Sequence, residues 1–229
     1  MRTAAILPVK TFQRAKQRLG ASVEDALRAA LAEAMVGDVL AALAASDGIA
    51  ATFVVTREPR AAAEALAIGA SVVEDRSETG QSEAAALGVA RALSDGFARV
   101  LCVPGDCPAI DPDEVATLLA ARRQGGPEAV VLPDRHGSGT NGLLLAPPDA
   151  IQLSFGPDSC ERHVALAVAA GVPCRVEALS SLTLDVDTGE DLAALRAALA
   201  RIEGRAPRTR AVLGEPAAAS AASVPFAGR

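Results

Sequence analysis

Short apolar runs alternate with longer segments rich in alanine and leucine along most of this chain. The short runs have the length and composition of strands, whereas the longer segments have the length and spacing of helices. Strands are predicted at residues 4–9, 52–56, 69–74, 100–103, 129–133, 143–146, 173–179 and 182–187. Helices are predicted at residues 26–45, 59–68, 81–93, 112–123, 159–170 and 190–200. This alternation predicts a single α/β domain with a mostly parallel, doubly wound sheet.

The run at residues 100–103 is apolar at every position, which is typical of a strand buried on both faces of a sheet. A Pro-Gly pair ends this run, and the carboxylate of Asp106 follows at once. Ligands of open α/β sheets bind beyond the carboxyl ends of the strands. An aspartate at a strand end often satisfies only the local turn amides. A second acidic strand end at Asp187 nevertheless favours a metal-binding role for both residues.

A basic loop follows the first predicted strand and carries Lys10, Arg14, Lys16 and Arg18. Phosphates usually bind at this position in α/β domains, where clustered cations neutralise them. A solvated turn explains the same residues equally well when they are considered alone. The loop lacks the glycine-rich patterns of a P-loop and of a dinucleotide-binding turn, so neither of those motifs applies.

A helix start at Asp158 or Ser159 follows a turn that contains Gly156. The unpaired amides of a helix N-terminus bind anions, and glycine lets the backbone approach them closely. Ser159 and His163 share a face of this helix, one turn apart. No Ser-His-Asp or Cys-His pattern is evident, so a surface or capping role is favoured for His163 and for His136.

Composition narrows the classes of function. The chain has 229 residues and a formal net charge of −6, so no overall positive field attracts nucleic acid or a membrane surface. No apolar stretch is long enough for a membrane span, and the N-terminal run is too short for a signal peptide. The four cysteines show no C-x-x-C spacing, which indicates reduced thiols in a cytoplasmic protein.

The C-terminal stretch at residues 204–229 is rich in Ala, Pro, Ser and Arg and has no periodicity. This composition predicts a disordered tail after a folded domain of residues 1–203. The alanine-rich helices suit either the core or a contact with a second subunit, so a homodimer stays open.

Two acidic strand ends, one basic loop and one helix N-terminus together fit the chemistry of divalent metals and phosphates. Mg²⁺ binds one or two carboxylates and completes its coordination shell with phosphate oxygens and water. Cationic side chains then neutralise charge that develops on the phosphates during transfer. The residues therefore predict an enzyme that acts on phosphates with Mg²⁺.

Five short segments in chain order resemble the guanylyltransferases of F420 biosynthesis, at residues 7–10 with 15–19, 105–108, 137–140, 155–163 and 185–188. The family includes phosphoenolpyruvate, 2-phospho-L-lactate and 3-phospho-D-glycerate guanylyltransferases, and the resemblance spans about residues 4–200. It implies a single-domain fold similar to the molybdenum-cofactor guanylyltransferases and the A-type glycosyltransferases. It also implies that GTP and a phosphorylated three-carbon acid yield a guanylylated acid and pyrophosphate.

The resemblance also implies roles for individual residues by position. An acid such as phosphoenolpyruvate would bind to Thr140, Gly156 and Ser159, and Mg²⁺ would bind to Asp106 and Asp187. The triphosphate would face Lys10, Lys16 and Arg18, and the nucleotide would contact Pro8, Gly80, Ser82 and Gly105. Catalysis would consist of positioning and charge neutralisation, because the phosphate of the acid is itself the nucleophile.

Departures from the family pattern bear on specificity. Gln17 stands where a small residue is usual, Gln81 and Ser82 replace a usual Leu-Asn pair, and Asn141 lies beside Thr140. The choice of acid and the selectivity for guanine therefore stay open, with phosphoenolpyruvate favoured by the resemblance.

Two other functions compete with this one. The first is a nucleotidyltransferase for 3-phosphoglycerate, a sugar phosphate or a molybdopterin, although the glycine-rich first loop with an arginine is missing here. The second is a non-catalytic nucleotide-binding module, which nucleotide binding without Mg²⁺ would favour, especially if it persisted in Asp106→Ala.

Overall fold

Seven strands form one sheet in the computed structural model, which describes residues 1–21, 24–121 and 125–214. The strand order from edge to edge is β3, β2, β1, β4, β6, β5, β7. β6 runs antiparallel to both of its neighbours, and every other adjacent pair is parallel. The predicted mostly parallel α/β sheet is therefore confirmed. Its strands are β1 Thr3–Val9, β2 Ile49–Thr56, β3 Ser71–Glu74, β4 Arg99–Cys102, β5 Glu128–Pro133, β6 Thr140–Ala146 and β7 Cys174–Val176.

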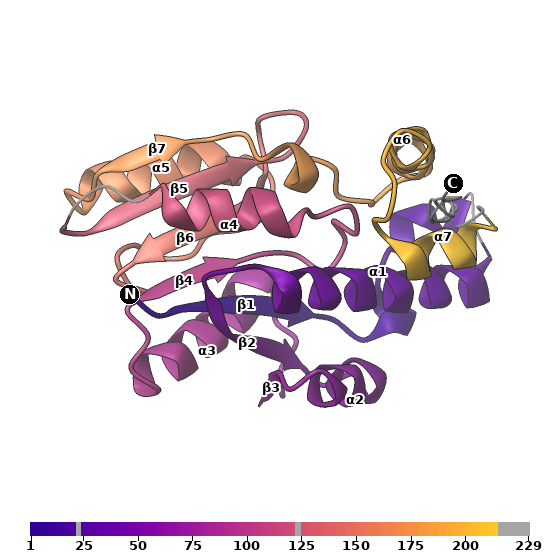
Figure 1. The fold of residues 1–229 in the computed structure, drawn as a ribbon, viewed down its shortest axis with the longest axis horizontal. Helices are drawn as coiled ribbons and strands as arrows, with labels where there is room; N and C mark the ends of the chain where they lie inside the picture. The colour runs from indigo at the N-terminus through magenta and orange to yellow at the C-terminus, as the bar shows by residue number, and fades with distance from the viewer. Residues whose placement is uncertain (22–23, 122–124, 215–229) are drawn as a thin grey trace, which may run out of the picture.

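Helices cover both faces of this sheet (Figure 1). On one face α1, α2 and α4 bury apolar side chains against strand residues such as Leu7 and Leu101. On the other face α3 and α5 pack on the alternate residues, such as Ile6 and Cys102. Successive strand residues point to opposite faces, so the continuous apolar runs supply both cores. The helices are α1 Asp25–Ala45, α2 Pro59–Ala67, α3 Gln81–Ser94, α4 Pro112–Ala120, α5 Ser159–Ala169, α6 Gly189–Leu199 and α7 Pro207–Leu213.

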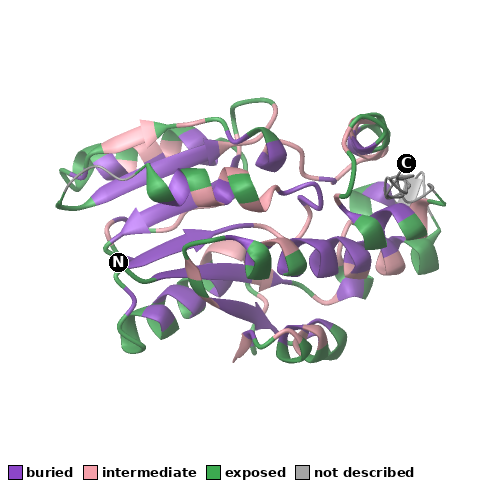
Figure 2. Cartoon of the chain, viewed as in Figure 1, coloured by how far each residue is buried: buried purple, intermediate pink, exposed green. Residues whose placement is uncertain are grey.

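Burial follows these layers, since the central strands are buried while the helices expose their outer sides (Figure 2). Every residue of β4 is buried, including Arg99. The guanidinium of Arg99 donates to Oγ1 of Thr3 at 2.8 Å and to the carbonyl oxygen of Leu119 at 3.0 Å. A buried charge is tolerated there because its donors have partners.

Local sequence signals determine where several helices begin. Asp111 caps α4 by accepting a hydrogen bond from the amide of Asp113 at 3.0 Å, and proline occupies the first helical position. Thr188 and Asp191 form a reciprocal capping box at the start of α6. Both starts lie within one residue of the prediction from the sequence.

The predicted acidic strand at residues 182–187 is wrong. A 3-10 helix, η3 Ser180–Leu182, stands at its beginning, and residues 183–187 pair with no strand. Because this segment crosses beyond the end of the sheet, no neighbouring strand is available to it. The amide of Val186 instead donates to the carbonyl oxygen of Asp106 at 3.2 Å. This bond brings the second acidic segment beside the first.

The predicted disordered tail is also wrong in its first part. α7 packs against α1, and the amides of Arg208 and Thr209 donate to the carboxylate of Asp38 at 3.1 and 2.8 Å. An apolar cluster beyond the end of the sheet joins α1, α6 and the beginning of α7 through Leu31, Met35, Val186, Leu195, Leu199 and Ala206. The folded unit therefore continues past residue 203 to the end of α7, and residues 215–229 lie outside the described residues.

The four cysteines are free, and Cys102, Cys107 and Cys160 are buried. Burial raises the pKa of the Cys102 thiol to about 12, so this side chain packs as a small apolar group. Within the described ranges, no helix combines the length and the hydropathy that a membrane crossing requires.

Candidate functional site

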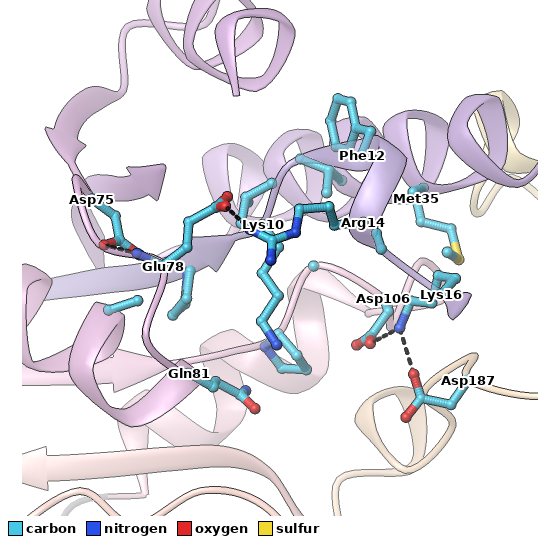
Figure 3. A pocket seen from close by; sticks show the side chains of 18 of the residues that line it. Lys10, Phe12, Arg14, Lys16, Met35, Asp75, Glu78, Gln81, Asp106 and Asp187 are labelled. Carbon is cyan, nitrogen blue, oxygen red and sulfur yellow. Dashed lines mark hydrogen bonds and ion pairs between the residues drawn. The ribbon is translucent and has the colours of Figure 1, made fainter. Parts of the chain in front are cut away.

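A pocket of about 260 Å³ lies at the carboxyl ends of β1 and β4, the edge at which ligands bind in open α/β sheets (Figure 3). The segments that follow β1, β3 and β4 surround it, together with the first turn of α3 and one residue from the loop before α6. The pocket brings together several residues that the sequence had singled out, namely Pro8, Lys10, Lys16, Gly80, Gly105, Asp106 and Asp187.

The turn after β4 brings the carboxylate of Asp106 into the pocket. A Cβ atom on Gly105 would lie 2.8 Å from Cγ2 of Val36 in α1, so a side chain at this position would push the turn away. Oδ1 of Asp106 is buried and has no hydrogen-bond partner in the described part of the chain. A buried carboxylate oxygen without a partner is costly, and a bound cation is one way to satisfy it.

Lys16 places its ammonium group between the two predicted metal ligands. Its Nζ donates to Oδ2 of Asp106 and, at 2.8 Å, to Oδ1 of Asp187 (Figure 3). The side chain of Lys16 is only 10% exposed. Burial opposes the charge, but the two carboxylates prevail and raise the pKa of Lys16 above its ordinary value. Lys16 is therefore a cation throughout the physiological pH range.

Asp106 and Asp187 fit a divalent cation by the chemistry of their oxygens. The space between them already holds a positive charge, and one carboxylate oxygen of Asp106 still lacks a partner. Asp185 is near, but its Oδ1 accepts a hydrogen bond from Nδ2 of Asn141 at 3.0 Å. Across the described residues, no group of three or more Asp, Glu, His or Cys side chains is arranged to hold a metal. Phosphate and water oxygens would therefore have to complete the shell of Mg²⁺.

The basic loop contains cations that face the pocket and one that does not. Lys10, Arg14 and Lys16 line the pocket, whereas Arg18 is exposed and lies outside the lining. Arg18 belongs to a 3-10 helix, η2 Gln17–Ala21, which buries Leu19 completely and leaves Arg18 in solvent. The structure therefore does not bring Arg18 to the site, and Arg14 is the additional cation of the pocket.

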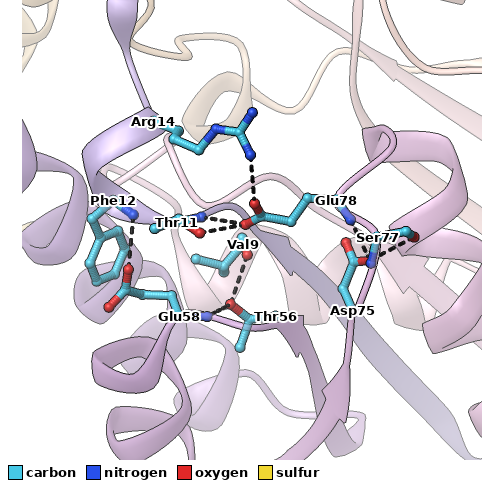
Figure 4. A network of polar contacts seen from close by, with 9 residues as sticks. All are labelled: Val9, Thr11, Phe12, Arg14, Thr56, Glu58, Asp75, Ser77 and Glu78. Atoms are coloured by element: carbon cyan, nitrogen blue, oxygen red, sulfur yellow. Dashed lines mark hydrogen bonds and ion pairs between the residues drawn. The ribbon is translucent and has the colours of Figure 1, made fainter.

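Two glutamates hold this basic loop against the sheet (Figure 4). Oε1 of Glu78 accepts hydrogen bonds from the amide and the hydroxyl of Thr11 at 2.9 and 2.6 Å, and its Oε2 pairs with Arg14 at 3.2 Å. Oε2 of Glu58 accepts from the amide of Phe12 at 3.1 Å. Burial opposes ionisation of Glu78, but the bonds from Thr11 outweigh it and lower the pKa of the carboxyl. The sequence singles out neither Glu78 nor Glu58, because their partners in the basic loop are distant in sequence.

A second polar group of residues, which we call the α5 cluster, consists of Thr140, Gly156, Ser159 and His163. Because β6 is antiparallel, its first residue, Thr140, lies at the same edge of the sheet as the end of β4. Ser159 opens α5, and its Oγ is buried without a hydrogen-bond partner among the described residues. Gly156 adopts φ +113°, which L-residues rarely do. None of these four residues lines the pocket, so the predicted acid-binding residues form a separate group.

The first amides of α5 are less available to an anion than the sequence suggested. The amide of Ser159 donates to the carbonyl oxygen of Gly156 at 3.2 Å, and that of Cys160 donates to Ser138 at 3.0 Å. Ser82, predicted to contact the nucleotide, also lies outside the pocket lining. Its Oγ instead accepts from the amide of Phe155 at 2.8 Å, which ties the start of α3 to the turn before α5.

His163 is fully buried, so the surface position favoured from the sequence is wrong. Its Nδ1 lies 3.0 Å from Oγ1 of Thr140, and its Nε2 accepts a hydrogen bond from the amide of Ser154 at 3.0 Å. The ring meets that of Phe155 edge to face at 5.1 Å. Burial, with the charge of Arg162 adding to it, lowers the pKa of His163 to about 4. The imidazole is therefore neutral at physiological pH.

Comparison with known sequences gives matches along nearly the whole folded chain. A family model described as "Guanylyl transferase CofC like" matches residues 3–199. A phosphoenolpyruvate guanylyltransferase of Conexibacter woesei is 46% identical over 215 residues, which cover 94% of this chain and 96% of the relative. A second, from Rubrobacter xylanophilus, is 40% identical over 197 residues, which cover 86% and 95%.

Solved structures share the fold at low sequence identity. A chain from Desulfovibrio desulfuricans G20, assigned to the nucleotide-diphospho-sugar transferases, has a TM-score of 0.70 at 20% identity over 93% of this chain and 95% of that one. The CMP:2-keto-3-deoxy-manno-octonic acid synthetase, solved with CTP, has a TM-score of 0.60 at 15% identity over 88% and 99%. The fold is thus that of nucleotidyltransferases, and the match over residues 3–199 shows that this chain belongs to the CofC-like guanylyl transferase family.

Proposed function

We propose that this protein transfers the guanylyl group of GTP to phosphoenolpyruvate and releases pyrophosphate, as a step in coenzyme F420 biosynthesis. The observation that carries the proposal is the pocket at the ends of β1 and β4, which is lined by Lys10, Lys16, Asp106 and Asp187. Two relatives named phosphoenolpyruvate guanylyltransferase, 46% and 40% identical, support this choice of acceptor. The free thiols agree with a cytoplasmic location.

The reaction needs binding and charge neutralisation more than it needs a protein nucleophile. A phosphate oxygen of phosphoenolpyruvate attacks the α-phosphorus of GTP, and the bond to the β-phosphate oxygen breaks as pyrophosphate leaves. Negative charge collects on the leaving pyrophosphate, where Lys10, Arg14 and Lys16 supply positive charge from one loop. The hydrogen bonds of Glu78 and Glu58 fix that loop and therefore fix the positions of its cations.

Asp106 and Asp187 would hold Mg²⁺, which neutralises charge on the reacting phosphates when it is bound. In the structure the ammonium of Lys16 occupies the space between these carboxylates. Lys16 therefore has two alternative partners, the carboxylates in the free protein and the phosphates of GTP in the complex. Its 2.8 Å contact with Asp187 is the more solvent-exposed of the two ion pairs, so that contact is the easier one to break.

We assign the two substrates to separate regions, the nucleotide to the pocket and the acid to the α5 cluster. The nucleotide fits the pocket, where Pro8, Gly80 and Gly105 leave room beside the cations of the basic loop. The acid would bind at the α5 cluster, where Thr140 and Ser159 stand at the beginnings of β6 and α5. The unpartnered Oγ of Ser159 is the atom that most clearly lacks a ligand there.

Pyrophosphate release by the purified protein with Mg²⁺ tests the proposal directly. The assay crosses four nucleoside triphosphates with phosphoenolpyruvate, 2-phospho-L-lactate and 3-phospho-D-glycerate. Release with GTP and phosphoenolpyruvate alone supports the proposal, and release with another pair replaces the substrates while keeping the reaction class. Release with no pair, in a preparation that binds GTP without Mg²⁺, would make the protein a nucleotide-binding module.

Ser159→Ala tests the placement of the acid. The variant removes one hydroxyl from a buried position and leaves the pocket lining unchanged. We expect the KM for the acid to rise by roughly 10-fold, as a lost hydrogen bond to a charged group predicts, with the KM for GTP unchanged. An unaltered KM for the acid would remove Ser159 from the substrate site.

A further inference from the structure

We propose that His163 is a positioning residue that orients the hydroxyl of Thr140, so that this hydroxyl donates its proton to an anionic group of the acid. The inference rests on the proposed placement of the acid at the α5 cluster. It goes further by giving a function to the buried imidazole, which the reaction itself does not use.

The tautomer of His163 follows from the contacts of its ring, which include a bond from the amide of Ser154, a contact with Thr140 and a backbone interaction with Ser159 that favours a protonated ring nitrogen. The amide of Ser154 lies 3.0 Å from Nε2, and a backbone amide can only donate. Nε2 must therefore be the unprotonated acceptor, which places the proton of the neutral ring on Nδ1. Nδ1 is 3.0 Å from Oγ1 of Thr140 and so donates to it. The main chain at Ser154 thus decides which way the bond to Thr140 points.

Because Nδ1 of His163 donates to Thr140, the proton of the Thr140 hydroxyl is available to another partner. A hydroxyl group has one proton and two lone pairs, and one lone pair of Oγ1 is used by His163. The proton of the Thr140 hydroxyl therefore needs an acceptor. Oγ of Ser159 is also buried and has no hydrogen-bond partner among the described residues. Two hydroxyls in one cluster with protons to donate are suited to a phosphate or carboxylate oxygen rather than to a cation.

The surroundings hold the imidazole in this state. The ring is fully buried and lies edge to face against Phe155. The guanidinium of Arg162, the charged group that acts on the ring, donates to Oγ of Ser154 at 3.0 Å and to its carbonyl oxygen at 3.1 Å. Arg162 therefore fixes the residue whose amide sets the tautomer, and its charge disfavours a second proton on the ring.

His163→Asn and His163→Gln form a matched pair that separates the two bonds. The amide nitrogen of asparagine can take the position of Nδ1 and still donate to Thr140, whereas the amide oxygen of glutamine can take the position of Nε2 and still accept from Ser154. We expect His163→Gln and Thr140→Val to raise the KM for the acid by about 10–100-fold. His163→Asn should raise it several-fold less, and kcat and the KM for GTP should change little in all three.

The reverse order, with His163→Asn worse than His163→Gln, would show that His163 acts by holding the turn at Ser154 and would overturn the proposal. A two-bond ¹H–¹⁵N spectrum of ¹⁵N-histidine-labelled His136→Gln protein tests the tautomer without any substrate and without a change at the α5 cluster. The chain has two histidines, and the exposed His136 is removed because its Nε2 also accepts a hydrogen bond, from Nε of Arg135 at 3.0 Å. A protonated Nδ1 with a bare Nε2 at pH 7 is expected for His163, and an Nε2-protonated or charged ring would refute the inference.

Failure of the acid placement would look different. In that case Thr140→Val and Ser159→Ala would both leave the KM for the acid unchanged while the spectrum still showed the expected tautomer. That result would overturn the proposed acid-binding role of the α5 cluster, and with it the role of His163 toward the substrate.

Discussion

Replacing Lys16 with methionine should make the free protein bind divalent cations more tightly while it binds GTP more weakly. Methionine keeps most of the apolar length of lysine but removes the ammonium group between Asp106 and Asp187. Without that charge, the two carboxylates repel each other, and a bound cation relieves this repulsion. The opposite signs of the two effects are the signature of a lysine that moves between carboxylates and phosphates.

The structure allows the size of the effect to be bounded. Two unit charges about 4 Å apart interact by about 4 kcal/mol at an effective dielectric constant near 20. The side chains of Asp106 and Asp187 are 20% and 45% exposed, so solvent weakens the second pair considerably. A net displacement cost of about 1.4–3 kcal/mol corresponds to roughly 10–100-fold tighter metal binding in Lys16→Met. The lost contact to phosphate should weaken GTP binding by about the same factor.

Titration with Mn²⁺, followed by the electron paramagnetic resonance signal of the free ion, measures the first effect without nucleotide. Isothermal titration with GTP measures the second. Lys10→Met is the matched control, because Lys10 lines the same pocket but has no ion pair to a described residue. It should weaken GTP binding and leave Mn²⁺ binding unchanged. Equal or weaker Mn²⁺ binding by Lys16→Met would refute the idea that its ammonium occupies the cation site.

Three further predictions follow from other contacts. Asp106→Asn should lower kcat by about 10²–10³-fold with an unchanged circular dichroism spectrum, because one charge is lost at a polar site. Gly88→Ala should lower the free energy of unfolding in urea. A Cβ atom there would lie 2.4 Å from Cγ2 of Ile6, and an overpacking cost of about 1–3 kcal/mol exceeds the helix-propensity gain of about 1 kcal/mol. The free energy of unfolding should also fall by up to about 3 kcal/mol as the pH drops from 6.5 to about 4, because unfolded His163 takes up a proton that the folded ring refuses.

Each of these predictions has its own contrary result. Retained turnover in Asp106→Asn would remove Asp106 from the proposed metal site. For Gly88→Ala the matched control is Gly37→Ala in α1, where the added methyl meets only the flexible side chain of Arg208. Equal stabilities of the two variants would show that Ile6 of β1 moves enough to accommodate the added methyl group of α3. Carboxylates titrate in part of the same pH range. The fall in the free energy of unfolding is therefore assigned to His163 only if it becomes smaller in His163→Asn.

Those parts of the fold that depend on local sequence could be predicted. The apolar run of β4, its Pro-Gly stop and Asp106 after it are adjacent in the chain, and they lie at the pocket as expected. The caps at Asp111 and Thr188 are equally local, because each side chain bonds to an amide two or three residues ahead. Such features need no knowledge of what packs against them.

The predictions from the sequence failed where the conformation of a residue depends on a partner that is distant in sequence. Lys16 meets Asp187 across 171 positions, so no spacing rule could show that the lysine occupies the space between the carboxylates. The helix α7 has seven residues and little periodicity, and it depends on amide bonds to Asp38, 170 positions away from Arg208. The sequence does not distinguish Arg18 from its cationic neighbours, because its exposure depends on the burial of Leu19, which sets the orientation of η2.

The reversal of β6 makes the two proposed substrate regions separable. The loops around the pocket follow parallel strands and lead into helices, so altering their length would shift a helix of the outer layer. Residues 134–139 instead join β5 to β6 directly as a hairpin, which contacts two helices through the bond from Cys160 to Ser138 and the ion pair of Arg135 with Asp191. A change of its length that keeps these two contacts would leave α5 and α6 in place. Thr140 is the first residue beyond this hairpin. The proposed acceptor region can thus be redesigned from this hairpin while the loops of the proposed nucleotide half keep their lengths.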